Sequence, residues 1–98
     1  MISRENFIFT IGYKRDTAVV SGELKRKYAR YSLEELLKEG LFKPAVSFAL
    51  YDGSEEELKM VLDSYNRMTD YPVSSVEELK RIFGVTRVPE EVEKVLVL

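Results

Sequence analysis

The sequence contains no histidine and no cysteine, the side chains on which many catalytic and metal sites depend. Without them, a serine–histidine or cysteine–histidine nucleophile pair is excluded within the chain, as is a zinc site of the usual Cys/His kind. No glycine-rich phosphate loop or calcium-loop pattern occurs either. We therefore expect a protein that is not an enzyme, with no catalytic, cofactor-binding or metal-ligating residues.

Other absences concern the environment in which the chain works. Glutamine is missing, and asparagine occurs only at positions 6 and 66, a composition typical of proteins that work at high temperature. The lack of cysteine makes a reducing cytoplasm the simplest location. No apolar run approaches the ~20 residues that span a bilayer, and no apolar segment follows the basic start. We expect a cytoplasmic protein without a membrane partner.

What is present favours one folded unit. Apolar residues make up 45% of the 98 residues, close to the average for globular proteins. A chain of this length supports one hydrophobic core, and a second core would be too small to be stable. No repeat or linker divides the sequence, so we expect a single compact domain over residues 1–98.

The first part of the chain predicts a β-hairpin. Aromatic and branched residues alternate over 7–13, and 17–21 is again rich in β-branched residues. The polar residues between them lack an Asn-Gly or Asp-Gly turn signal. Two strands alone are marginal in water, so the hairpin needs helices or a third strand against it.

The remainder of the chain has helical periodicity. Three Ser-x-x-Glu capping boxes begin at Ser32, Ser54 and Ser75, each before an apolar stripe, and Gly40 and Gly84 are suited to end the first and third of these helices. We predict an α+β fold in which the hairpin packs on five or six short helices, the apolar 44–51 segment being central. Their predicted ranges are 23–31, 33–39, 44–51, 55–67, 76–83, and 89–96 as either a helix or the third strand.

Basic charge is concentrated near the start of the chain. Residues 1–31 carry seven basic and three acidic side chains, whereas residues 32–98 carry eight basic and fourteen acidic ones. The basic segment is interleaved with tyrosines, which can stack on unpaired bases while cations neutralise phosphates. The candidate nucleic-acid-binding residues are Tyr13, Lys14, Arg15, Arg26, Lys27 and Arg30. The alternative is that the tyrosines face the core and the cations form a solvated helix face.

Acidic residues cluster at Asp52, Glu55, Glu56 and Glu57. Several carboxylates together are typical of Mg²⁺ or Ca²⁺ sites. The same residues also suit the first turn of a helix, where acidic side chains complement the helix dipole. Because Glu34/Glu35, Glu77/Glu78 and Glu90/Glu91 follow the same pattern, we favour the dipole interpretation.

Residues 75–86 resemble the first helix and turn of a helix-turn-helix DNA-binding domain. Gly84, Val85 and Thr86 follow the predicted 76–83 helix as glycine, apolar and hydroxyl residues follow the first helix in that family. The resemblance implies that a second, DNA-reading helix follows this turn. The sequence departs from the family there, because Pro89 interrupts that helix and three glutamates, at 90, 91 and 93, would face phosphates.

Two function classes remain after these exclusions. The first is a non-enzymatic protein-interaction module that binds a protein partner or itself as a homodimer, with exposed members of Phe42, Met60, Met68 and Tyr71 as contact residues. The second is a nucleic-acid-binding accessory protein that uses the basic and aromatic segment 13–31. We favour the first, since no chemistry points elsewhere.

Overall fold

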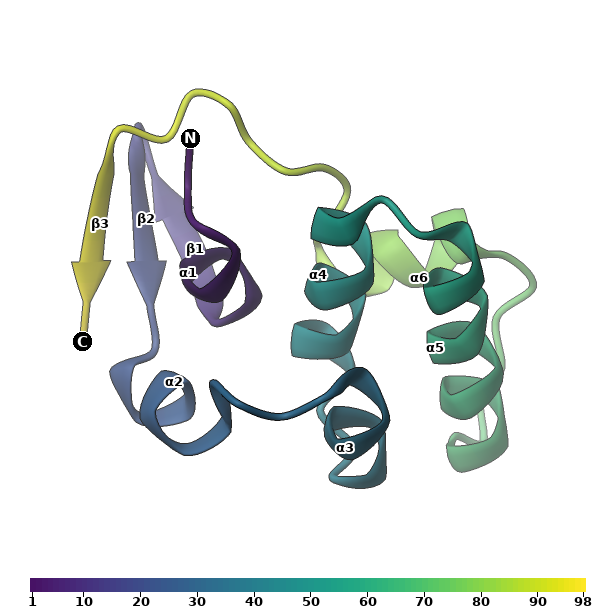
Figure 1. The fold of residues 1–98 in the computed structure, drawn as a ribbon. Coiled ribbons are helices and arrows are strands. Elements are labelled where there is room, and N and C mark those ends of the chain that lie inside the picture. The colour runs from purple at the N-terminus through teal and green to yellow at the C-terminus, as the bar shows by residue number, and fades with distance from the viewer.

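The chain forms six helices and one three-stranded sheet, and the computed structural model describes residues 1–98 (Figure 1). In chain order the elements are α1 (Arg4–Ile8), β1 (Thr10–Lys14), β2 (Thr17–Val20), α2 (Gly22–Tyr28), α3 (Leu33–Lys38), α4 (Phe42–Asp52), α5 (Glu55–Met68), α6 (Val76–Phe83) and β3 (Lys94–Val97). This confirms the predicted α+β class with an N-terminal hairpin. The five helices predicted between residues 23 and 83 are present, with ends that shift by up to three residues.

The start of the hairpin differs from the prediction, which placed a strand over 7–13. Residues Arg4–Ile8 form the short helix α1, and β1 begins only at Thr10. The Ser3 hydroxyl accepts a hydrogen bond from the Asn6 backbone N–H and caps this helix. Phe7, Ile8 and Phe9 are all buried, so the alternation that suggested a strand does not correspond to one buried and one exposed face.

The sheet has the order β1-β2-β3, with β2 in the middle. β1 and β2 are antiparallel and joined by a two-residue turn at Arg15 and Asp16, since Lys14 pairs with Thr17. β3 runs parallel to β2, with Lys94 opposite Thr17 and Val97 opposite Val20. The third-strand alternative is thus correct for the end of the chain, and the helix alternative over 89–96 is wrong. The edge of β2 that does not face β1 has backbone N–H and C=O groups that need hydrogen-bond partners. A strand at the end of the chain supplies these partners, whereas a helix there would not.

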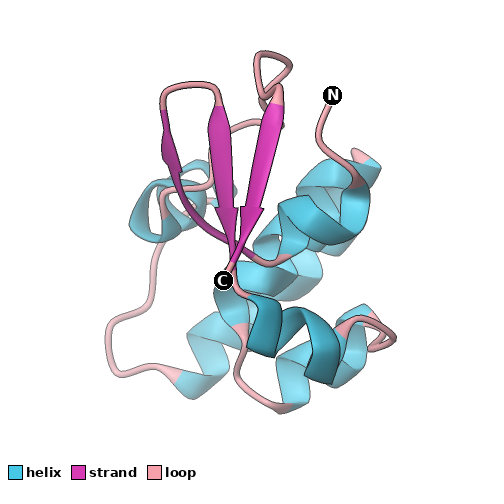
Figure 2. Cartoon of the chain, turned by 90° about the vertical axis from the view of Figure 1, so that its left-hand side faces the viewer, coloured by secondary structure: helices cyan, strands magenta, loops and turns pink.

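The helices lie on one face of the sheet. In Figure 2 the three strands are side by side, and no helix crosses in front of them. α4 is the central helix, as predicted, since it packs against α1, α3, α5 and α6. Its residues Ala45, Val46 and Ala49 are fully buried, as are Ala18 and Val20 on the inner face of β2. No helix of the chain is long and apolar enough to cross a membrane.

Serine residues fix the helix starts. Besides Ser3 and Ser21, the three predicted serines accept a hydrogen bond from the backbone N–H three residues on. Only the Ser32 motif is a reciprocal capping box, in which Glu35 also accepts from the Ser32 N–H at 2.9 Å. The Glu78 carboxylate accepts instead from Ser74. The predicted stops at Gly40 and Gly84 are confirmed by their positive φ angles of 72° and 69°.

Candidate functional site

The predicted nucleic-acid-binding residues fall into two separate groups. Tyr13 and Lys14 end β1, and Arg15 is in the turn that follows. The other three residues, Arg26, Lys27 and Arg30, are on or just after α2. Because β2 runs from the turn to the start of α2, the two groups lie at opposite ends of the sheet (Figure 1). The structure therefore does not bring the six residues onto one surface.

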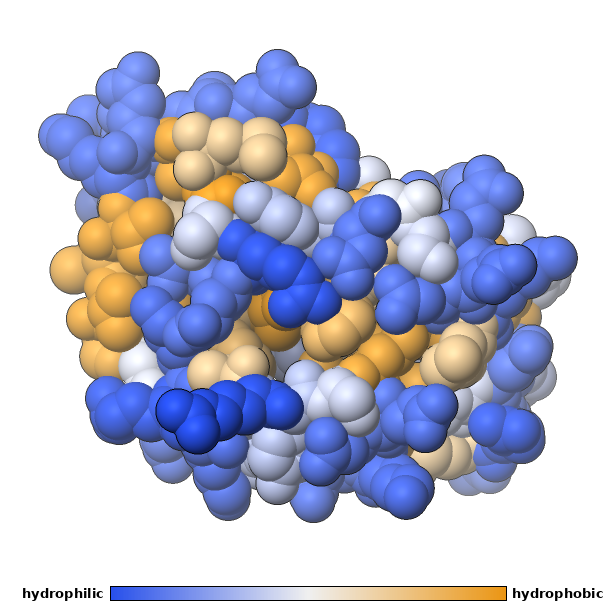
Figure 3. Space-filling view, in the orientation of Figure 1, coloured by the Kyte–Doolittle hydropathy of each residue, from blue (hydrophilic) through white to orange (hydrophobic).

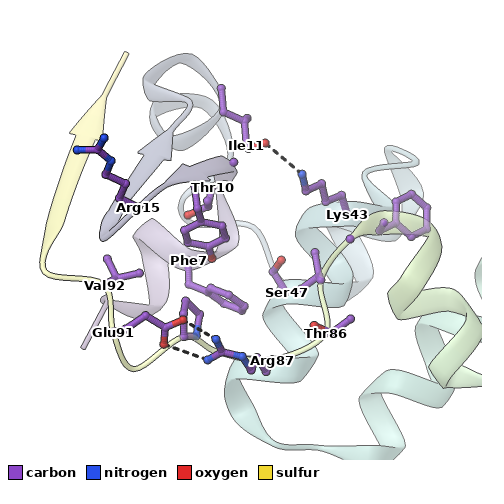
Figure 4. Close-up of a pocket in the computed structure, with 16 residues that line it drawn as sticks. Phe7, Thr10, Ile11, Arg15, Lys43, Ser47, Thr86, Arg87, Glu91 and Val92 are labelled. Atoms are coloured by element: carbon purple, nitrogen blue, oxygen red, sulfur yellow. Dashed lines mark hydrogen bonds and ion pairs between the residues drawn. The ribbon is translucent and has the colours of Figure 1, made fainter.

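The first group borders a cavity of about 430 Å³, which we call the turn cavity (Figure 4). It lies between the hairpin, α4 and the irregular segment that joins α6 to β3. Tyr13 and Arg15 line it, whereas Lys14 does not. The full lining is Phe7, Thr10, Ile11, Gly12, Tyr13, Arg15, Lys43, Ser47, Phe83, Gly84, Val85, Thr86, Arg87, Pro89, Glu91 and Val92.

Charged side chains stand at the border of the turn cavity. The Arg87 guanidinium donates two hydrogen bonds to the Glu91 carboxylate, one of them 3.0 Å long. This contact lowers the pKa of Glu91 to about 2 and raises the pKa of Arg87. The Lys43 ammonium lies 3.4 Å from the Ile11 carbonyl oxygen. Burial raises the pKa of Tyr13, and the neighbouring Thr10 hydroxyl offsets part of this rise. The phenol is therefore protonated near neutral pH.

The second group borders another concavity of about 440 Å³, which we call the α2 cavity. Its lining is Glu5, Gly22, Lys25, Arg26, Lys27, Ala29, Arg30, Tyr31 and Val97. Lys25 is engaged, because its ammonium donates to the Asn6 side-chain oxygen at 2.7 Å and lies 3.9 Å from the Glu5 carboxylate. Arg26 and Arg30 take part in none of the four ion pairs of the structure.

The two tyrosines beside the α2 cavity pack against the core, as the alternative to nucleic-acid binding predicts. Tyr28 and Tyr31 are partly buried against the main core, and their rings meet edge to face at 4.9 Å. The Lys27 ammonium lies 5.3 Å from the centre of the Tyr28 ring. One face of that ring is thus covered by a cation, and base stacking on Tyr28 would have to displace it.

The acidic cluster is divided by its contacts. Asp52 ends α4 and forms a two-bond contact with Arg4, whose donor atoms lie 2.9 and 3.2 Å from the carboxylate oxygens. Residues 55–57 occupy the first turn of α5 behind the Ser54 cap. No three acidic side chains converge in a way that would hold a metal ion. The geometry is that of a capped helix start next to an ion pair.

The proposed contact residues differ in exposure. Phe42 is partly buried and packs edge to face on Tyr65 at 5.3 Å. Met60, Met68 and Tyr71 are exposed, Tyr71 by 83%. They belong to α5 and the segment that follows it, whereas Phe42 opens α4. We base no function on them.

The most exposed apolar element is β3, which was not singled out as a contact surface from the sequence. All four of its residues are exposed, and the apolar ones are Val95 (39%), Leu96 (52%) and Val97 (47%). Leu98, directly after the strand, is 67% exposed. Figure 3 shows this apolar surface gathered at the left side of the molecule, where Figure 1 places β3. The run Val-Leu-Val-Leu in the sequence signalled a buried strand, and only the sheet order reveals that its outer edge is open.

The backbone of β3 is also only half satisfied. The Lys94 N–H donates to the carbonyl oxygen of Asp16 in the turn at 3.3 Å, and the Leu98 N–H donates to that of Val20 at 2.9 Å. The Leu98 carbonyl oxygen accepts from the Gly22 N–H. In a parallel ladder the backbone direction alternates, so Leu96 also bonds toward β2. The N–H and C=O groups of Val95 and Val97 consequently point away from the sheet. We call these groups, with the Val95–Leu98 side chains, the β3 edge.

The resemblance to a helix-turn-helix domain stops at the turn. α6 ends at the left-handed Gly84, and residues 84–93 form no second helix. They instead cross the molecule to β3 and border the turn cavity (Figure 1). In comparisons with known proteins, the chain matches no family model, and neither a curated protein nor a solved structure gives a significant match.

Proposed function

We propose that this protein is a non-enzymatic interaction module that associates with a second copy of itself by pairing the β3 edges. The observation that carries the proposal is the combination of open backbone groups with exposed apolar side chains on one strand. Edge strands of soluble proteins are ordinarily protected by charge, proline or a covering element. β3 has only Lys94 as a charged residue and no proline. Such an edge favours addition of a further strand.

The outward N–H and C=O groups of β3 favour one register between two paired β3 strands. If two β3 strands pair antiparallel about Leu96, Val95 of one copy faces Val97 of the other, twice. Both residues direct their N–H and C=O groups outward, so each facing pair exchanges two hydrogen bonds, and all outward groups of both strands are satisfied. Leu96 then lies opposite Leu96 of the second copy as a close, non-hydrogen-bonded pair. A self-complementary patch of this kind is what a two-fold dimer requires.

Side-chain positions support the same arrangement. Val95 and Val97 pair with Ala18 and Val20, so their side chains share the inner face of the sheet. Those β2 residues are fully buried, whereas Val95 and Val97 remain 39% and 47% exposed. The helical layer therefore stops short of β3 and leaves room for a second copy. Pairing would produce a continuous six-stranded sheet with both helical layers on one face.

A charge-swap experiment tests this proposal. Stable protein interfaces bury about 1,600 Å² in total, and two four-residue strands bury less, so we expect a Kd of roughly 10 µM to 1 mM. Sedimentation velocity over that concentration range should show a monomer–dimer equilibrium. Leu96→Lys and Leu96→Glu should each be monomeric, because like charges would face each other at the two-fold axis. An equimolar mixture of the two variants should form dimers again.

The matched control is Met60→Lys on α5, where a residue of similar exposure (40%) lies away from β3. This variant should associate like the wild type. A wild-type protein that stays monomeric throughout the range contradicts the proposal. So does a mixture of the Leu96 variants that remains monomeric.

Nucleic-acid binding is the alternative function, and it is supported by the four basic side chains around the α2 cavity. With Tyr13, Lys14 and Arg15 at the other end of the sheet, this function would depend on α2 alone. Fluorescence anisotropy with a single-stranded RNA at low ionic strength tests it. Binding that falls steeply with salt and is lost in Arg26→Ser/Arg30→Ser, but retained in Lys14→Ser/Arg15→Ser, would support it. Absence of binding at low salt would exclude it.

A further inference from the structure

The turn cavity has the size of a ligand site and core residues in part of its lining, although no part of the proposed dimer uses it. Its volume of about 430 Å³ is in the range of roughly 300–1,000 Å³ that is common for small-molecule pockets. Phe7, Val85 and Val92 line it and are themselves at least nine-tenths buried. These residues come from α1 and from the segment after α6, so the cavity exists only in the folded chain.

Hydroxyl groups from three separate elements border the same space. Thr10 and Tyr13 belong to β1, Ser47 to α4 and Thr86 to the segment after α6. The Thr10 hydroxyl donates to the Asn6 carbonyl oxygen at 2.6 Å, so its proton is not available to a ligand. The Tyr13 phenol is protonated near neutral pH, because the ordinary pKa of tyrosine is about 10 and the surroundings of Tyr13 raise its pKa further. Tyr13, Ser47 and Thr86 can therefore serve as neutral hydrogen-bond donors.

The charge of the cavity lining is positive. Lys43, Arg15 and Arg87 border it, and Glu91 is its only acidic residue. Glu91 is paired with Arg87, whereas Lys43 takes part in none of the ion pairs. In Figure 4 the Arg15 guanidinium points away from the other labelled residues. Lys43 is thus the cation available to a ligand, and Arg87 could become a second if a ligand displaced Glu91.

We infer that the turn cavity binds a small organic anion, with an apolar ring system against Phe7, Val85 and Val92 and a carboxylate or phosphate group at Lys43. The apolar wall accounts for the ring. The Lys43 ammonium, which has no acidic partner and only a 3.4 Å contact to the Ile11 carbonyl oxygen, accounts with the hydroxyls of the same cavity for the anionic group. The α2 cavity is also basic, and its share of hydrophobic residues, three among nine, is close to that of the turn cavity, six among sixteen, but none of its three is a buried core residue. A ring in the α2 cavity would therefore meet no rigid wall of core residues.

Two probes with the same ring and substitution position distinguish the possible anionic groups, 2-naphthyl phosphate and 2-naphthoate. Each is titrated into the ¹⁵N-labelled full-length protein and followed by amide chemical shifts. We expect saturable shifts centred on Gly12, Gly84 and Thr86, which border the cavity. The group on the tighter-binding probe identifies the preferred anion. Inorganic phosphate lacks the ring, and 2-naphthol lacks the anionic group. Each should bind at least about tenfold more weakly than the probes, a difference of about 1.4 kcal/mol.

Matched variants locate the binding. Lys43→Met keeps the side-chain stem and removes the charge, and it should raise the Kd at least about tenfold. Arg30→Met makes the same change at the α2 cavity and should alter the Kd less than about twofold. Shifts that do not saturate, equal binding of 2-naphthol, or a loss of binding in Arg30→Met in place of Lys43→Met would overturn the inference. Repeating the titration with Leu96→Lys separates this result from that of the dimer proposal, because the two sites are independent.

Discussion

At the scale of single residues, Arg15 has the most unusual backbone of the chain. It is the only non-glycine residue with a positive φ angle, 59°, and it is the first residue of the two-residue hairpin turn. An L-residue in this region costs roughly 1–2 kcal/mol, and glycine avoids that cost at the expense of greater chain entropy in the unfolded state. We predict that Arg15→Gly stabilises the fold by about 0.5–1 kcal/mol and raises Tm by roughly 3–6 °C.

Thermal unfolding monitored by circular dichroism measures this effect, and Arg15→Ala is the control. Alanine removes the long side chain but keeps Cβ, so Tm should not rise. An equal gain in both variants would place the cause in the side chain and contradict the backbone explanation.

The sequence predicted the conformations of glycines better than that of Arg15. Gly40 and Gly84 follow apolar helical stripes, and this position alone indicates a left-handed helix end. Arg15 is preceded by a lysine and followed by an aspartate, and no turn signal identifies it. The site residues share this difficulty, since a basic residue has the same sequence pattern whether it faces a cavity or open solvent. Lys43, which the inference depends on, had no local signal at all.

At the scale of elements, the starts of α3 and α5 offer a comparison of two similar motifs. Glu35 accepts a hydrogen bond from the Ser32 N–H, and this contact lowers its pKa. Glu57 does not reach back to Ser54, and burial together with the nearby Asp52 raises its pKa. We therefore predict that Glu35→Ala lowers Tm at neutral pH, whereas Glu57→Ala leaves Tm unchanged or raises it.

Acidification provides a second measurement of the same contact. A carboxylate with a lowered pKa in the folded state stabilises the fold above the pKa of the unfolded chain, and this contribution is lost as the pH falls through the folded value. The Tm difference between the wild type and Glu35→Ala should accordingly disappear in acid. A difference that persists at a pH where both states are protonated would mean that the glutamate acts by packing.

Helices were the most predictable elements because their signals are local. A serine cap, an apolar stripe and a glycine stop lie within about ten residues of one another, and α6 has the predicted bounds of 76–83. α1 was missed because Phe7 and Phe9 suggested a two-residue period, although Ser3 and Asn6 supply a helix start. β3 stayed ambiguous because a short apolar run satisfies either period. β3 forms a strand because it pairs with the open edge of β2, which is distant in sequence.

At the scale of the whole molecule, the mixed sheet determines which amides are protected. We predict that the Leu96 and Leu98 N–H groups exchange slowly with solvent at low protein concentration, since they bond toward β2, whereas Val95 and Val97 exchange fast. At concentrations that favour the dimer, Val95 and Val97 should become protected. Hydrogen exchange followed by NMR measures each amide separately. If Val95 is as protected as Leu96 in dilute protein, or if Leu96→Lys shows the same gain with concentration, the proposed edge pairing is wrong.

The parallel pairing of β3 with β2 also orders the events of biosynthesis. The ribosome must extend the chain from Val20 to Lys94 before the two strands can meet, which takes roughly 4–15 s at about 5–20 residues per second. During that interval the emerged hairpin has an unpaired β2 edge, with Ala18 and Val20 on its inner face. α1 and α4 emerge earlier and can cover that face, but only β3 can cover the edge. Nascent chains on neighbouring ribosomes would therefore be exposed to mispairing at β2, and a short interval before β3 appears would limit that risk.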